Sequence, residues 1–111
     1  MITAIQVNYA ERGILGETEQ RSDRRTYGIT AKWVDKAIET VLRLGSKDVF
    51  AAAHFNHGDD SNDVIWQEYD QRSTRMLTWR HDIDTWNSYA PVSISAADFK
   101  RYIKKHLEGA A

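Results

Sequence analysis

Apolar residues recur every three or four positions between residues 30 and 45, which is the spacing of a helix with one buried face. Thr30 suits the N-cap position, and Gly45 follows the last apolar position, where a left-handed glycine closes many helices. The apolar positions are Trp33, Val34, Ala37, Ile38, Val41, Leu42 and Leu44. Because strand-like segments flank this stretch, residues 26–56 predict a strand, a helix and a strand in succession.

Alternating apolar and polar residues predict further strands along the chain. In the clearest of them, Leu77, Trp79 and His81 share one face. Pro91 lacks a backbone N–H and therefore suits the edge of a sheet. The expected strands outside the central unit are 2–9, 64–69, 75–83 and, as a short edge strand, 90–94.

Two polar segments separate these elements. Residues 10–25 predict a long connection, and loops of that length are commonly functional or mobile. Residues 57–63, HGDDSND, have the composition of a turn throughout. Ser95 and Asp98 then have the spacing of a capping box at the start of a closing helix. The apolar stripe of that helix is Phe99, Tyr102, Ile103, His106 and Leu107.

The order of these elements, β-β-α-β-β-β-α, predicts an α+β fold with one largely antiparallel sheet of about five strands and two helices packed on one face. A chain of 111 residues with no repeat and no linker is expected to form a single domain over residues 1–111. The absence of cysteine excludes disulfides and a cysteine nucleophile. No leader sequence and no apolar run of membrane-spanning length is present, so we expect a cytoplasmic location and no membrane partner.

Histidine and aspartate gather in and around the turn-like segment, a combination that suits a divalent metal. His54 and His57 are the candidate ligands, but residues three apart on a strand point to opposite faces, so the two converge only if the strand ends between them. For Arg80, Asp82 and Asp84 a salt-bridged sheet surface is the simpler account. No catalytic motif is recognisable, so we expect no metal, no cofactor and no enzymatic activity, with a small metal-dependent hydrolase as the second alternative.

Acidic residues are concentrated in one region although the formal net charge is only −1. An acidic surface with aromatic anchors fits a protein partner whose own surface is basic, such as a nuclease or a nucleic-acid-binding effector. The expected partner-binding residues are Asp59, Asp60, Asp63, Trp66, Glu68, Asp82, Asp84, Trp86 and Tyr89. We therefore expect a small non-enzymatic inhibitor or adaptor that is similar, in size and charge layout alone, to phage anti-defence proteins such as anti-CRISPR proteins and to toxin immunity proteins. The oligomeric state stays open.

The closing helix supplies the first alternative, a nucleic-acid-binding module. Its basic residues are Lys100, Arg101, Lys104 and Lys105. From residue 30 onward the order α-β-β-β-α resembles the double-stranded-RNA-binding domain, and the resemblance implies phosphate contacts from this helix. That family has lysines where this chain has Ser95 to Asp98, and its phosphate-binding loop corresponds to the acidic segment 57–63. Because both differences disfavour phosphate, we expect a solvated helix face here in preference to a nucleic-acid surface.

Overall fold

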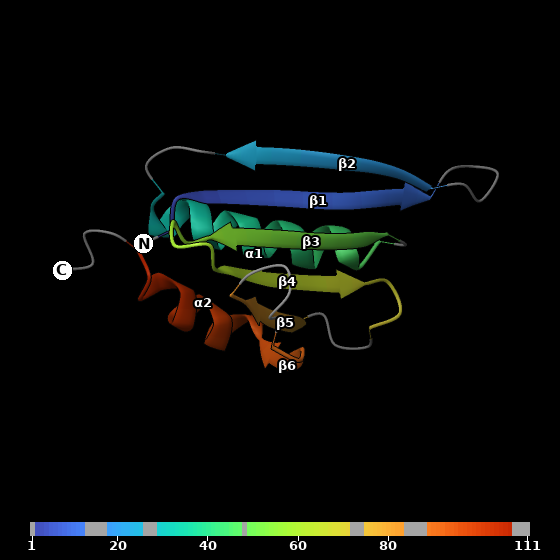
Figure 1. The fold of residues 1–111 in the computed structure, drawn as a ribbon. Coiled ribbons are helices and arrows are strands. Elements are labelled where there is room, and N and C mark those ends of the chain that lie inside the picture. Colours follow the sequence, from blue (N-terminus) through green and yellow to red (C-terminus); the bar gives the residue numbers. More distant parts are fainter. Residues whose placement is uncertain are drawn as a thin grey trace.

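The chain folds into one six-stranded antiparallel sheet with two helices, in the strand order β2-β1-β3-β4-β5-β6 (Figure 1). The computed structural model describes residues 2–12, 18–25, 29–47, 49–71, 75–83 and 89–107, with the backbone alone at 11–12 and 18–25. The elements are β1 Ala4–Arg12, β2 Thr18–Arg25, α1 Ala31–Gly45, β3 Phe50–Asn56, β4 Asn62–Glu68, β5 Met76–Asp82, β6 Val92–Ser95 and α2 Ala96–Lys104. The expected α+β class is confirmed, with six strands in place of about five, and β6 is the short edge strand expected near Pro91. The strand expected just before the helix falls mainly on residues 26–28, outside the described residues, and residues 29–30 form no strand.

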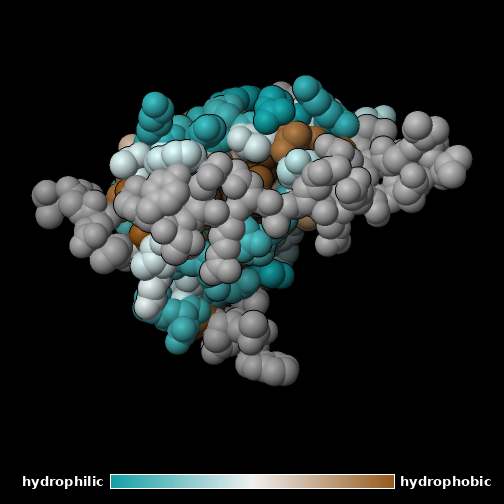
Figure 2. Space-filling view, turned by 90° about the horizontal axis from the view of Figure 1, so that it is seen from above, coloured by the Kyte–Doolittle hydropathy of each residue, from teal (hydrophilic) through white to brown (hydrophobic). Residues whose placement is uncertain are grey.

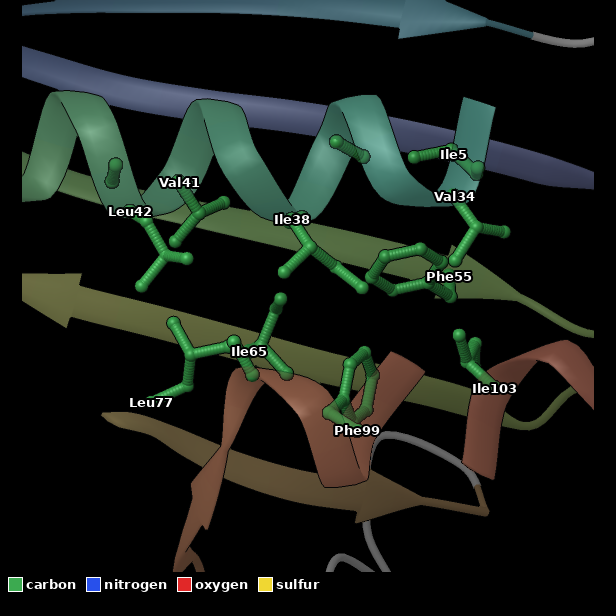
Figure 3. Packing of buried hydrophobic residues seen from close by; sticks show 14 of the residues in the cluster. Ile5, Val34, Ile38, Val41, Leu42, Phe55, Ile65, Leu77, Phe99 and Ile103 are labelled. Atoms are coloured by element: carbon green, nitrogen blue, oxygen red, sulfur yellow. The ribbon is translucent and has the colours of Figure 1, made fainter. Parts of the chain in front are cut away.

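Both helices cover one face of the sheet, and the hydrophobic core lies between the helices and that face (Figure 3). Val34 and Ile38 of α1 and Phe99 and Ile103 of α2 are all fully buried against this face. The strand residues below them include Ala51, Ala53, Phe55, Ile65 and Leu77. The small alanines of β3 let α1 approach closely, as the sequence predicts. The opposite face carries no helix among the described residues.

The expected long loop at residues 10–25 is wrong. β1 continues to Arg12, and Thr18–Arg25 forms β2, which pairs with β1 from Ile5↔Arg25 to Arg12↔Thr18. The sequence TEQRSDRR of β2 has no apolar alternation, so pattern reasoning does not detect it. Its place is the edge of the sheet, where backbone pairing with one neighbour suffices and a polar strand resists pairing with other chains.

The helix boundaries follow the predicted positions, but for different local reasons. Thr30 is the N-cap of α1 with an extended backbone, yet its side chain makes no capping hydrogen bond. Gly45 lies inside the helix and is buried against β4, where a Cβ atom would meet the Gln67 Cβ and carbonyl oxygen at 2.8 Å. This glycine therefore serves close packing, and the expected left-handed helix end is wrong. At α2 the N-cap half of the expected capping box is confirmed, because the Ser95 hydroxyl accepts from the Asp98 N–H at 3.1 Å.

Seen from above, the described surface is mainly hydrophilic, with small separate groups of apolar residues (Figure 2). No helix in the described part of the chain is long and apolar enough to cross a membrane.

Candidate functional site

The most unusual feature of the fold is a fully buried carboxylate, Asp63, near the start of β4. Its Oδ1 accepts hydrogen bonds from the Trp79 indole N–H at 2.8 Å and from His81 Nδ1 at 2.9 Å. Its Oδ2 lies 2.5 Å from His57 Nε2. The Tyr102 hydroxyl donates at 3.3 Å and 3.4 Å to the two oxygens. Four side chains from three other parts of the fold thus converge on one negative charge, which offsets the large cost of burying it.

The carboxylate fixes the orientation of two imidazole rings. His57 is held through Nε2 and is only 5% exposed, whereas His81 is held through Nδ1 and keeps 28% of its side chain exposed. Each of these rings contacts a further ring. His81 stacks on Tyr89 with the ring centroids 5.8 Å apart, and His57 meets His106 edge-on with the centroids 4.9 Å apart. We call these residues the Asp63 cluster: His57, Asp63, Trp79, His81, Tyr102 and His106. It joins the sheet to Tyr102 of α2 and to the turn that follows this helix.

Electrostatics keep the buried charge on the carboxylate. Burial raises the pKa of Asp63, but the hydrogen bonds from His57, His81 and Trp79 outweigh it and hold that pKa below its ordinary value. Burial, followed by the Asp63 charge, raises the pKa of Tyr102 to about 12, so its hydroxyl remains a donor. Burial and then the electrostatic interaction with the neighbouring His57 lower the pKa of His106, while Asp63 opposes that shift.

The hydrogen bonds of the cluster do not leave an open position for a metal ion between its two central histidines. His57 Nε2 and His81 Nδ1 both face the Asp63 carboxylate, which occupies the position that a cation between them would need. Among the described side chains, no group of three or more histidine, aspartate and glutamate residues is placed to hold a metal ion. β3 does end between His54 and His57, but His54 is half-buried on the helix-free face whereas His57 turns toward Asp63, so the two do not converge.

The turn between β3 and β4 is tightly ordered above this cluster. The His57 N–H donates to the Ser61 carbonyl at 2.9 Å, and the Asp59 carboxylate accepts from the Ser61 hydroxyl at 2.6 Å. Asp60 has a φ of 68°, the only positive φ of a non-glycine residue among the described residues. An aspartate held in this left-handed region is uncommon and is more frequent at functional sites. The expected turn is shorter than predicted, because Asn62 and Asp63 already belong to β4.

Exposed apolar residues lie at the same end of the sheet. Tyr89, which stacks on His81 and donates its N–H to the His81 carbonyl at 3.0 Å, is 58% exposed. Ile83, one residue past the end of β5, is 39% exposed. We call Asp59, Asp60, Ile83 and Tyr89 the turn-end surface. Its described side chains combine two carboxylates with two apolar groups.

The remaining expected partner-binding residues are distributed over other parts of the molecule. Asp63 is buried, so the expectation that it contacts a partner at the surface is wrong. Glu68 is exposed at the opposite end of the seven-residue β4, roughly 20 Å from the turn. Trp66 and Asp82 lie on the helix-free face, where the Arg80 guanidinium sits 5.9 Å from the Trp66 ring and its Nε lies 2.8 Å from an Asp82 oxygen. Asp84 and Trp86 are outside the described residues.

The basic residues of α2 are largely neutralised by neighbouring carboxylates. Lys100 pairs with Glu39 and Lys104 with Asp35, both on α1, and Arg101 pairs with Asp98 of its own helix. The exposed Lys105 completes the four. A phosphate at this face would compete with three existing ion pairs, which weakens the expected nucleic-acid alternative.

The sequence matches no protein-family model, and comparisons with curated proteins and with solved structures gave no significant match. Sequence reasoning missed the cluster because its members are far apart, with Trp79, His81 and Tyr102 lying 16, 18 and 39 residues beyond Asp63. The available signal was the face shared by Trp79 and His81 on β5, which points toward the helix stripe that contains Tyr102 and His106.

Proposed function

We propose that this chain is a small non-enzymatic protein that binds another protein through the turn-end surface and acts as an inhibitor or adaptor. The partner has a basic surface, as a nuclease or a nucleic-acid-binding effector does. One observation carries the proposal: an exposed carboxylate, Asp60, is held in a strained backbone conformation at the same end of the sheet as the exposed Tyr89.

The composition of the surface suits this role. Aromatic and aliphatic side chains are the usual anchors of a protein interface, and Tyr89 and Ile83 are largely accessible. The carboxylates of Asp59 and Asp60 provide a charge that would steer a basic partner and fix its orientation.

Rigidity also supports the proposal. The Asp63 cluster lies directly beneath the surface, because Tyr89 stacks on His81 and the turn starts at His57. A surface whose side chains are already ordered loses less conformational entropy when it binds. The helix side of the molecule offers no comparable set, since three of the four basic residues of α2 are engaged in ion pairs.

The test is an affinity capture from a nuclease-treated lysate, followed by a direct binding measurement with the purified partner. The test variant combines Asp60→Asn with Tyr89→Ser. The matched control combines Asp70→Asn with Tyr69→Ser, because Tyr69 is 59% exposed and lies with Asp70 at the opposite end of β4. Asparagine tolerates the left-handed conformation, so Asp60→Asn keeps the turn.

We expect the test variant to lose affinity by about tenfold or more and the control to bind as the wild type does. An equal loss in both variants, or no loss in either, would refute the proposed surface. Partners that disappear on nuclease treatment, with a steep salt dependence that Lys104→Ala and Lys105→Ala together reduce, would instead favour the basic helix.

A further inference from the structure

A polar hollow opens beside the β3–β4 turn. It has a volume of about 460 Å³, within the range of roughly 300–1,000 Å³ that is usual for ligand pockets. The turn residues Gly58, Asp60 and Ser61 form one side, and Asn56 and Asn62 of the flanking strands continue it. Thr3 and His57 complete the lining.

The residues that line the hollow favour a positively charged ligand. Asp60 contributes a carboxylate, and the neighbouring hydroxyl and amide side chains contribute further oxygen acceptors. Neither lysine nor arginine is among the described residues that line the hollow. An anion would meet the Asp60 charge without a strong counter-charge, because the His57 ring is already shared with Asp63 at 2.5 Å.

The turn keeps the hollow open and in shape. Gly58 has a φ of 39°, and a Cβ atom there would lie 3.0 Å from the Thr3 methyl group, so a side chain would be strained and would crowd this wall. The Thr3 N–H donates to the Asn56 carbonyl at 2.8 Å, which ties these two lining residues together. His57 is 5% exposed and held by Asp63, so it anchors the start of the turn.

We propose that this hollow receives an arginine side chain of the protein partner. A guanidinium group is planar and carries five N–H donors that match dispersed oxygen acceptors, whereas a lysine ammonium is compact and strongly hydrated. Its place is beside the Asp60 carboxylate, with its remaining N–H donors near the side-chain oxygens of Ser61 and Asn62. This inference rests on the proposed function, because it assigns the chemistry of the partner at the same end of the sheet.

The experiment is a titration of the isotope-labelled protein with N-acetyl-arginine amide, followed in amide NMR spectra. The expected result is saturable shifts at Thr3, Gly58 and Asn62. N-acetyl-citrulline amide, which has nearly the same shape without the charge, should give none. Asp60→Asn should weaken the arginine response by about tenfold or more, and Glu68→Gln should leave it unchanged.

Three outcomes would overturn the inference: no shift with arginine, an equal response to citrulline, or a stronger response to N-acetyl-lysine amide. The proposed function has a separate test, because Tyr89 does not line the hollow. A variant carrying Tyr89→Ser alone that loses the partner, combined with no arginine response in the wild type, would preserve protein binding and remove only the arginine assignment.

Discussion

The two ends of β4 are similar at the surface and different underneath. Each end has exposed carboxylates and one exposed tyrosine, Tyr89 at 58% and Tyr69 at 59%. Each also has a turn fixed by a side chain, since the Asp59 carboxylate accepts from Ser61 and the Gln71 side-chain carbonyl accepts from the Glu68 N–H at 2.7 Å. Only the β3–β4 end, however, is built over a buried charge.

The difference lies in what holds each end. At the β3–β4 end, Asp63 of β4 and its donors connect the β3–β4 turn, β5 and α2 through hydrogen bonds. At the other end, Gly45 of α1 packs directly on Gln67, and Leu77 is fully buried beside them. Close packing tolerates small displacements, whereas a buried charge requires all its donors in place. The β3–β4 end is therefore expected to be the more precisely ordered of the two.

Removing the buried charge should give the largest difference in stability between the two ends of β4. Asp63→Ala leaves the donors of two histidines, a tryptophan and a tyrosine unsatisfied, so we expect a loss of about 3–5 kcal/mol in the free energy of unfolding. Urea denaturation measures it. Glu68→Ala, at the exposed end of the same strand, should change stability by less than about 0.5 kcal/mol.

If Asp63→Ala does not fold, Asp63→Asn keeps the shape and removes the charge. We expect this variant to lose about 1–3 kcal/mol, because one of its two oxygens is replaced by a donor that faces other donors. A loss no larger than that of Glu68→Ala would mean that the cluster does not hold this end of the sheet.

A smaller effect is expected from a single donor. Tyr102→Phe removes the hydroxyl that contacts both oxygens of Asp63 and should cost about 1 kcal/mol in the free energy of unfolding. Tyr69→Phe is the control at the exposed end and should be close to neutral. In a double-mutant cycle, Tyr102→Phe and Asp63→Asn should show a coupling of about 0.5–3 kcal/mol. Strictly additive losses would separate Tyr102 from the cluster.

The same contrast explains how far the sequence alone predicts the fold. The helix stripe of α1 and the alternation of β5 are strong periodic signals, because each depends on one large buried face. β2 has no such face, and only its pairing with β1 makes it a strand. Gly45 was expected at the correct boundary but for the wrong reason, because local rules do not include the approach of β4.

The site was less predictable, because burial of a polar residue depends on distant partners. Asp63 stands in a segment whose composition is that of a turn, and nothing nearby distinguishes it from the exposed Asp60. Its burial follows from the register Phe55↔Asp63↔His81, which places it on the helix-covered face. The pairing of Lys100 and Lys104 with carboxylates of α1 depends likewise on how the two helices pack.

The two turns should also respond oppositely to glycine. At Asp60, with its φ of 68°, glycine is unstrained and alanine is not, so Asp60→Gly should be more stable than Asp60→Ala by about 1 kcal/mol. At Asp70, which has no positive φ, glycine only adds freedom to the unfolded chain, so Asp70→Ala should be the more stable by about 0.5–1 kcal/mol. Thermal unfolding of the four variants measures both signs. The same sign at both positions would contradict the strained conformation of Asp60.

Mild acid should have the smallest effect of these changes, and it should act on the β3–β4 end, where His57, His81 and His106 all lie. Burial lowers the pKa of His106 in the folded protein, so below the unfolded value of about 6.5 the unfolded chain takes up more protons. Stability is therefore complete above that value and decreases as the pH falls toward the folded pKa. His54 on the helix-free face, whose pKa is also lowered by burial, contributes in the same direction.

The pKa of Asp63 is lowered as well, but the stability that it contributes is lost only in stronger acid, as the pH falls below about 3.8. Between about pH 7.5 and 5.5 the loss should thus come from histidines, and His106→Gln should reduce it. Hydrogen-exchange protection factors, corrected for the intrinsic pH dependence, should fall first in the turn that follows α2, where the His106 carbonyl accepts from the Ile2 N–H at 3.1 Å. The amides around Glu68 and Asp70 have no histidine beside them and should keep their exchange rates relative to global unfolding. Equal acceleration at both ends would show that acid weakens the whole sheet and that the Asp63 cluster is no more sensitive than the packed end.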